Sequence, residues 1–385
     1  MISAALSASN CSRLKMVTRQ PIALFLCGDV MTGRGLDQIL PDPVNPTLYE
    51  SYVRDAREYV YLAEAVHGPI PRRVAFDYVW GDVFQELASP TTDARIVNLE
   101  TSITRAEEPW LKGINYRMSP GNIGCLKAAR IDCCCLANNH ILDWGPTGLA
   151  ETIETLDRAR IAHAGAGSSA TEAAAPAVCL LPGKGRIMVY ALGSTSSGIP
   201  SIWGAGDNQP GVNILTDLSD NTADCITAEI DKTKQPGDIV VVSIHWGENW
   251  GYEIPSEQIS FAHRLIEGGV DLVHGHSSHH VKAVEVYRKK LVLYGCGDFL
   301  TDYEGISGYE QFRGDLGLMY LAQIEPSQGQ LLALRIVPVQ SRRFRLECAS
   351  PTDAQWLCRV FNDLGKPFGT EIRIEKDHSL VLETE

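Results

Sequence analysis

Short apolar runs rich in valine, isoleucine and leucine alternate with segments of helical periodicity along most of this chain, which leaves few folds open to it. A strand buried on both faces is a nearly continuous apolar run, whereas a helix covering a sheet has apolar residues three and four positions apart. Alternation of the two patterns is typical of an α/β fold with a parallel or mixed sheet. The predicted strands are 22–27, 95–99, 133–137, 178–181, 187–192, 239–244, 272–274, 281–287, 291–295, 318–324 and 331–337.

Turn residues separate the helical segments from the strands. Pro146 and Pro255 each precede a helical pattern, at a position where proline favours the first turn. Three short links are typical of hairpins, over 182–185, 288–290 and 326–329. The predicted helices are 76–87, 121–130, 147–160, 222–234, 256–267 and 352–364.

These patterns divide the chain into a main domain with a short segment at each end. Residues 1–20 are predicted to be a disordered extension, and Met16 is an alternative start. Residues 21–340 are predicted to form the α/β domain, which is interrupted by a proline- and tyrosine-rich insertion at 36–75. Such an insertion is typical of a surface lobe or a lid over a site. Residues 341–385 are predicted to form a small appended αβ segment.

The charge balance excludes one large class of partners. The chain has 34 lysine and arginine residues against 47 aspartate and glutamate residues, which gives a formal net charge of −13. A field of this sign repels phosphate backbones and anionic membrane surfaces. The sequence therefore predicts that nucleic acid is not a partner.

Apolar runs and cysteine usage bear on where the protein works. We find no run of about 18 uncharged apolar residues, the minimum for a spanning helix, so direct membrane insertion is not expected. The first 20 residues carry their cationic side chains behind the weakly apolar stretch, which is the reverse of a secretory signal. The 11 cysteines include three consecutive ones at 133–135, a pattern that favours buried free thiols over disulfides. A cytoplasmic protein is predicted, and its oligomeric state is left open.

Polar residues follow directly after many of the predicted strands. In an α/β sheet, functional groups gather where strands end, and buried charged groups are costly unless they are paired or bind a metal. Carboxylate and imidazole ligands together suit Zn²⁺, Mn²⁺ or Fe²⁺. The residues at these positions are Asp29, Glu100, Asn138, Asn139, His140, His245, His274, His276, His279, His280 and Asp298.

Six short segments contain these residues and occur in a fixed order. They are GDVMTGR (28–34), NLETSIT (98–104), ANNHILDWG (137–145), HWGENWGYE (245–253), HGHSSHHVKAVE (274–285) and YGCGDF (294–299). Together they resemble the CapA family, the poly-γ-glutamate capsule biosynthesis proteins related to calcineurin-like metallophosphoesterases. The resemblance covers residues 22–340. It implies a metallophosphoesterase-like β-sandwich of mixed sheets, flanked by helices, with a metal site at the strand ends.

The resemblance also implies a set of metal ligands. The related phosphoesterases have an Asp-x-His motif, but Met31 occupies the histidine position here, and Glu100 replaces the bridging aspartate. The terminal histidine motif is one residue longer than in the phosphoesterases. Both one ion and two ions remain open. The implied ligands are Asp29, Glu100, Asn139, His245, His276 and His279.

His140 is predicted to act as a general acid or base rather than as a ligand. Asp143 is predicted to orient its second ring nitrogen, the usual way in which a carboxylate fixes an imidazole tautomer. The alternative role for Asp143 is to cap the helix that begins near Pro146. His274 and His280, which flank the matched pair, are interpreted as solvated or core histidines.

Four further residues are assigned on weaker patterns. Arg34 is predicted to bind a substrate carboxylate or phosphate, as is Arg117, and an ordinary ion pair is the alternative for both. Trp246 is predicted to line a substrate groove, with core packing as its alternative. Asp298 is predicted to support a ligand histidine or to close a turn.

The leading hypothesis is a metal-dependent enzyme of poly-γ-glutamate, capsule or related peptide metabolism. Its metal would polarise a carbonyl or phosphoryl group or activate water, and its substrate would be a peptide, poly-γ-glutamate or a phosphorylated small molecule. The CapA-like resemblance leaves three alternatives open. These are a metal-dependent peptide epimerase of a natural-product pathway, a phosphoesterase, and a non-catalytic subunit of a polymer-synthesis complex.

Overall fold

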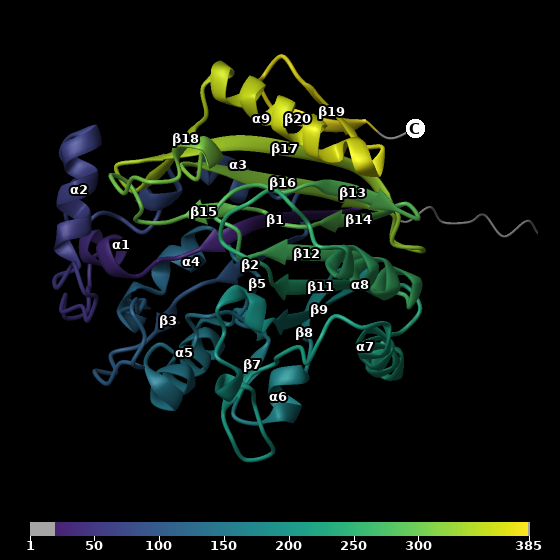
Figure 1. Cartoon of the computed structure of the whole chain (residues 1–385), viewed down its shortest axis with the longest axis horizontal. Helices are drawn as coiled ribbons and strands as arrows, with labels where there is room; N and C mark the ends of the chain where they lie inside the picture. Colours follow the sequence, from purple (N-terminus) through teal and green to yellow (C-terminus); the bar gives the residue numbers. More distant parts are fainter. Residues whose placement is uncertain (1–19, 384–385) are drawn as a thin grey trace, which may run out of the picture.

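Two large β-sheets form the centre of the protein in a computed structural model that describes residues 20–383 (Figure 1). The extension predicted over 1–20 lies outside the described residues, except for its last residue. The first sheet has the order β19-β20-β17-β16-β1-β2-β5-β6, with β15 beside β1 and β18 beside β17. Its strands are β1 (Ile22–Val30), β2 (Ala94–Leu99), β5 (Cys133–Cys135), β6 (Ala162–Ala164), β15 (Asp298–Leu300), β16 (Leu316–Ile324), β17 (Leu331–Arg342), β18 (Arg345–Cys348), β19 (Glu371–Ile374) and β20 (Leu380–Glu383).

The second sheet has the order β13-β14-β12-β11-β9-β8. Its four inner strands run parallel, and the hairpin partners β8 and β13 run antiparallel at its edges. Its strands are β8 (Ala177–Leu181), β9 (Gly185–Gly193), β11 (Ile239–His245), β12 (Leu272–His276), β13 (Val284–Tyr287) and β14 (Lys290–Leu293). The predicted α/β sandwich of mixed sheets is therefore confirmed.

Alternation of side chains along β11 builds the two layers of the core. Val241 belongs to the buried cluster that also contains Leu24 and Leu26 of the first sheet. Its neighbours Val240 and Val242 belong to a second cluster, with the helices α7 (Asp220–Thr233) and α8 (Ser256–Glu267). Because successive strand residues point to opposite faces, one face of β11 packs against the first sheet and the other against helices.

Each predicted strand and each predicted hairpin is present. The helices predicted over 147–160 and 352–364 are α5 (Gly145–Ala159) and α9 (Pro351–Gly365), and those over 222–234 and 256–267 are α7 and α8. The single helix predicted over 76–87 is wrong. The segment forms the 3-10 helix Tyr78–Val83, which is kinked at Gly81 with φ +46°, followed by the short helix α3 (Phe84–Leu87). The helix predicted over 121–130 is shorter in the structure, as α4 (Gly124–Ala128) after a 3-10 turn.

The insertion at 36–75 contains helices that the sequence pattern did not indicate. They are α1 (Arg34–Ile39), which begins just before it, and α2 (Arg57–His67). Buried Asp37 fixes α1 by accepting hydrogen bonds from Val44 N, Ser119 N and Asn122 Nδ2. The remaining short elements are α6 (Ala170–Ala174) and two small pairs, β3 (Ser102–Ile103) with β4 (Arg117–Met118) and β7 (Ala166–Gly167) with β10 (Gly211–Val212).

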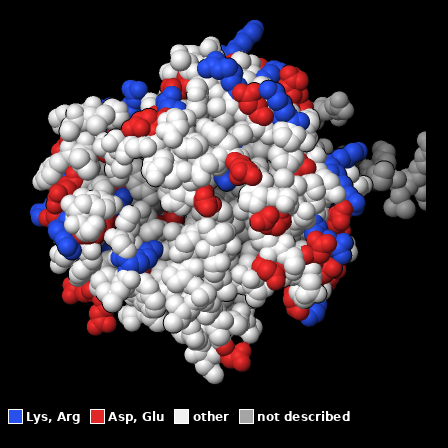
Figure 2. All heavy atoms as spheres, in the orientation of Figure 1, with Lys and Arg blue, Asp and Glu red and all other residues white. Residues whose placement is uncertain are grey.

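Within residues 20–383, the charged side chains and the cysteines have the following arrangement. On the face shown in Figure 2, acidic and basic side chains are interspersed and lie mainly toward the periphery. The cysteines of this part of the chain are all free, as expected from their pattern. Among the described helices, none combines the length and apolarity that a membrane crossing requires.

A close approach beside the candidate site gives a stability prediction. A Cβ atom at Gly28 would lie 1.6 Å from the carbonyl oxygen of Gly297, so β1 can pass the chain before β15 only without a side chain. We expect Gly28→Ala to lower the free energy of unfolding by about 1–3 kcal/mol or more, the cost of overpacking. Urea denaturation measures this. Gly113→Ala, which meets no atom within 4 Å, is the control, and equal effects in both variants would contradict the argument.

Candidate metal centre

Strand register brings the predicted ligands of the second sheet together. His245 of β11 is the register partner of His276 in β12, two residues beyond the pair Ser243 and His274. Ser243 and His245 lie at alternate positions after Val241, so they are on the same inward face of β11. Toward the end of the strand, polar side chains therefore take the place of apolar core side chains. The Nδ1 atoms of His245 and His276 lie 2.8 Å apart, and both side chains are about 1% exposed.

The first sheet contributes the carboxylates in the same way. Asp29 of β1 is paired in register with Asn98 of β2 on one side and with Asp298 of β15 on the other. Asn98 Nδ2 donates to Asp29 Oδ1 over 2.7 Å, and Asp29 Oδ1 lies 3.7 Å from His276 Nδ1. Glu100, just after β2, has its Oε1 atom 3.8 Å from His245 Nε2. The two sheets therefore face each other through these candidate ligand groups.

Two sets of donor atoms are close enough to bind one ion each. Asp29, His245 and His276 form one set, and Asp29, Glu100 and Asp298 form the other, with all atoms within 4.8 Å of one another in each set. Asp29 is common to both. This arrangement has room for one ion or two.

The chemistry of these donors fits a divalent cation. Asp29 Oδ2 and Glu100 Oε2 are buried oxygens without a hydrogen-bond partner. Burial and the nearby charge of Asp298 raise the pKa of Asp29 to about 7. Burial and the charge of Asp29 raise the pKa of Glu100 well above its usual range. Burial lowers the pKa of both His245 and His276, which keeps the imidazoles in the neutral form that binds metals. A cation would remove the cost of the buried carboxylates.

Two predicted ligands lie beside these sets. Asn139 Oδ1 is 3.1 Å from His245 Nε2, at the edge of the first set. His279 Nδ1 lies 3.0 Å from Asp298 Oδ1, and its Nε2 faces Asn249 at 3.0 Å. Burial disfavours the charged form of this imidazole, but the carboxylate of Asp298 raises the pKa of His279 overall. Asp298 thus contacts His279, as its sequence interpretation proposed, and also belongs to one donor set.

His140 and Asp143 form a hydrogen-bonded dyad next to the donor sets. His140 Nδ1 lies 2.6 Å from Asp143 Oδ2, and His140 Nε2 lies 3.9 Å from Glu100 Oε1. Burial is the main cause that lowers the pKa of His140 to about 4, so the ring is neutral at pH 7. Lys112 Nζ forms an ion pair with Asp143 Oδ1 over 2.7 Å. Tyr116 stacks on the His140 ring, with centroids 3.8 Å apart.

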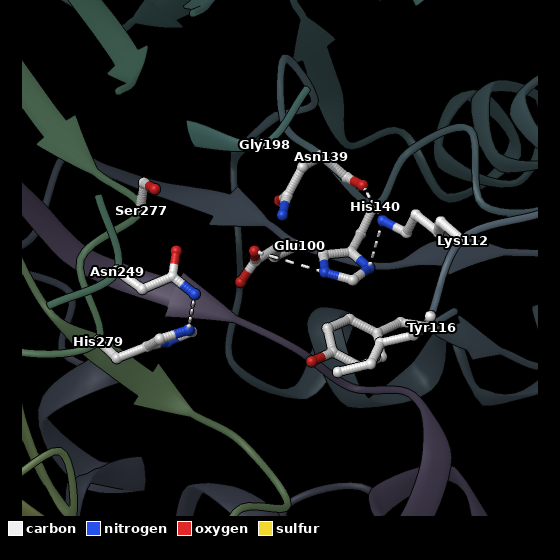
Figure 3. A pocket seen from close by; sticks show the side chains of 11 residues that line it. Glu100, Lys112, Tyr116, Asn139, His140, Gly198, Asn249, Ser277 and His279 are labelled. Carbon is white, nitrogen blue, oxygen red and sulfur yellow. Dashed lines mark hydrogen bonds and ion pairs between the residues drawn. The ribbon is translucent and has the colours of Figure 1, made fainter. Parts of the chain in front are cut away.

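A cavity of about 350 Å³ opens onto these groups. Figure 3 shows Glu100, His140 and Lys112 on one side and Asn249 with His279 on the other. The cavity volume is at the lower end of the range for small-molecule sites. The lining residues are Glu100, Lys112, Gly113, Ile114, Tyr116, Asn139, His140, Gly198, Asn249, Ser277 and His279.

Three residues predicted to contact substrate do not line this cavity. Arg34 is 3% exposed and forms ion pairs with Asp302 and Glu50, the alternative role considered for it. Trp246 is 2% exposed, stacks on Tyr294 and donates from Nε1 to Tyr294 O in the cluster beneath α8. Arg117 is also buried and donates to the carbonyl oxygens of Ala106 and Asn45. These three residues are therefore left out of the proposed substrate site.

Sequence reasoning missed several residues of the site. Asn98 interrupts an apolar strand, and this buried amide was the available signal. Lys112 and Tyr116 belong to a segment without regular periodicity, so nothing in the local sequence placed them beside His140. Ser277 adopts φ +104°, a strained value for a residue other than glycine, directly after His276.

Comparisons with known proteins identify a matching family and several relatives. The family described as Bacterial capsule synthesis protein PGA_cap matches residues 23–303. The probable polyglutamine synthesis accessory protein of Mycobacterium tuberculosis (strain H37Rv) is 44% identical over 361 residues, which cover 93% of this chain and 95% of that protein. The PGA biosynthesis protein CapA of Bacillus subtilis is 24% identical over 297 residues, 75% of this chain and 66% of that protein.

A further relative matches over part of its length. The capsule biosynthesis protein CapA of Bacillus anthracis is 29% identical over 195 residues, which cover 50% of this chain and 45% of that protein. The family match extends from β1 to the loop after β15 and thus includes every residue of the two donor sets. The chain belongs to the bacterial capsule synthesis protein PGA_cap family.

Proposed function

We propose that this protein is a metal-dependent enzyme that acts on a peptide, poly-γ-glutamate or phosphorylated substrate during polyglutamate or capsule synthesis. One observation carries the proposal: buried, unpartnered oxygens of Asp29 and Glu100 lie beside His245 and His276, where a cavity ends at the neutral imidazole of His140. The family and the names of the relatives support the polymer context.

Asp29, His245 and His276 would hold the cation, with Glu100, Asn139, Asp298 and His279 at its edges. Bound there, a divalent ion supplies polarisation of a carbonyl or phosphoryl oxygen, or a water of lowered pKa. The ligand types suit Mn²⁺, Zn²⁺ or Fe²⁺.

His140 supplies the proton transfer in this proposal. Asp143 accepts the hydrogen bond from His140 Nδ1, which leaves Nε2 unprotonated and available to accept a proton within the cavity. Lys112 contributes the positive charge of the lining and favours a substrate carboxylate or phosphate. Asn139, Asn249 and Ser277 add neutral hydrogen-bonding groups to the walls.

Metal content tests the first half of the proposal. We expect elemental mass spectrometry to find about one or two ions per chain after loading with Mn²⁺ or Zn²⁺, and at least a tenfold loss in His276→Ala. The control is His263→Ala, because His263 lies on α8 and contacts Glu285 instead of the donor sets. Equal metal content in wild type and His276→Ala would contradict the ligand assignment.

Substrate assays test the second half. The metal-loaded protein is incubated with glutamate oligomers in deuterated water and, separately, with an aryl phosphate. Chain cleavage supports action on a carbonyl, deuterium at an α-carbon without cleavage supports epimerisation, and phosphate release supports a phosphoesterase. If the metal-loaded protein forms none of these products, the enzymatic proposal is overturned.

The name of one relative favours a second candidate function. The Mycobacterium tuberculosis protein is called an accessory protein, which suits a subunit whose metal is structural. In that case His276→Ala would lose metal and lower the thermal midpoint, and His140→Ala would be indistinguishable from wild type in polymer synthesis.

A further inference from the structure

A buried arginine connects the two sides of the cavity without lining it. Arg34 donates from Nε and Nη2 to Asp302 over 3.2 and 2.5 Å, and from Nη1 to Glu50 over 3.1 Å. Arg34 adopts φ +45°, which is uncommon for a residue other than glycine. Asp302 also accepts from Gly35 N over 2.8 Å. The surrounding hydrogen bonds therefore hold Arg34 in a strained backbone conformation, as is typical near functional sites.

The guanidinium contacts three tyrosine rings that come from three parts of the chain. Its central carbon lies 3.9 Å from the ring centre of Tyr59, 4.7 Å from that of Tyr116 and 5.6 Å from that of Tyr303. Tyr59 belongs to the insertion, Tyr116 directly precedes β4, and Tyr303 follows β15. The Arg34 guanidinium therefore holds together three segments that are far apart in sequence.

Two of these tyrosines contact the imidazoles on opposite sides of the cavity. Tyr116 stacks on His140 at 3.8 Å with an angle of 16° between the rings. Tyr303 lies edge-on to His279 at 5.5 Å. The hydroxyl groups of Tyr116 and Tyr303 are hydrogen-bonded over 2.8 Å.

We infer that Arg34 is a positioning residue that sets the spacing of His140 and His279 across the cavity, through Tyr116 and Tyr303. The inference rests on the proposed role of His140 in proton transfer. Lysine cannot replace Arg34 in this role, because a point charge cannot donate in one plane to Asp302 and Glu50 while it stacks between rings. The insertion acts on the site from a distance, since Glu50 and Tyr59 contact the arginine and not the cavity.

Nuclear magnetic resonance of protein labelled with ¹³C at histidine Cε1 tests this inference without any activity. The His140 signal is assigned from its loss in His140→Gln, and the His279 signal in the same way from His279→Gln. In Arg34→Lys we expect the His140 signal to move downfield, because the ring loses the shielding of stacked Tyr116. The His279 signal should move as well, while the signals of His163 and His263 stay in place.

Arg95→Lys is the matched control. Arg95 is also buried, 5% exposed, and paired with Asp132, but it lies at the far end of β2. Unchanged His140 and His279 signals in folded Arg34→Lys, or equal shifts in Arg95→Lys, would overturn the inference. If Arg34→Lys does not fold, Tyr303→Phe removes only the hydroxyl link, and the absence of shifts at His140 and His279 in that variant would overturn it.

Kinetics add a second readout once a substrate is identified. We expect Arg34→Lys to lower kcat by about tenfold or more with little change in KM or in bound metal, because misplaced catalytic groups slow the reacting step. Equal loss in Arg95→Lys would contradict a positioning role. If the proposed enzymatic function fails, the histidine spectra still decide whether Arg34 positions the two rings.

Discussion

The His140→Ala variant is expected to keep its bound metal and to lose about 10²- to 10⁴-fold in kcat, the usual contribution of a general acid or base. The reason is geometric: His140 Nε2 faces the cavity, while the donor sets are formed by other side chains. The measurement combines metal content with turnover of the substrate on which the wild type is active.

His163→Ala is the control for His140→Ala. His163 lies on β6 and contacts Asp157 at 3.2 Å, away from the cavity. Unchanged kcat in His140→Ala would remove the imidazole from the reaction. Loss of metal in this variant would make His140 a ligand instead of a proton carrier.

The metal-free protein should lose stability relative to Asp29→Asn as the pH rises from 5 to 8. The pKa of Asp29 is raised from 3.8 to about 7, with burial as the largest cause and the charge of Asp298 next. Between these values the unfolded chain has lost the proton that the folded chain keeps. Stability therefore falls as the pH rises toward 7 and is constant above it. The change between pH 5 and pH 8 corresponds to about 3 kcal/mol.

Urea denaturation in the presence of a chelator measures this difference at the two pH values. Adding the metal should reverse the trend, because ligand carboxylates bind only after losing their protons. Asp37→Asn is the matched control, since burial raises the pKa of Asp37 to about 6 in α1, away from the donor sets. A metal effect as large in Asp29→Asn as in wild type would contradict the role of Asp29.

The sequence predicted the strands well because their burial on both faces leaves an almost unbroken apolar pattern. It also placed Asp29, His245 and His276 at strand ends, and parallel pairing then brings such ends to one edge. The roles of these side chains in binding metal remain predictions. The sequence pattern did not contain the register between neighbouring strands. This register pairs His245 with His276, and Asp29 with Asn98 and Asp298.

The residues that sequence reasoning misplaced owe their positions to distant parts of the chain. Arg34 is close in sequence to Asp29, but its partners Asp302 and Glu50 lie 268 and 16 residues away. Trp246 directly follows His245, but strand alternation turns it to the opposite face, where it packs under α8. The prediction of one helix over 76–87 was wrong because the positive φ of Gly81 interrupts the regular helix.

The donor groups come from opposite layers of the sandwich. Asp29 and Asp298 belong to strands of the first sheet, whereas His245 and His276 belong to the second. Near this end a hydrogen bond from His274 Nε2 to Cys27 O, 2.7 Å long, already crosses between the layers. A cation at this position would cross-link the two sheets, and its binding constant would depend on the distance between them. Core substitutions outside the donor sets, such as Val241→Ala, would then weaken metal binding by letting the two sheets shift relative to each other.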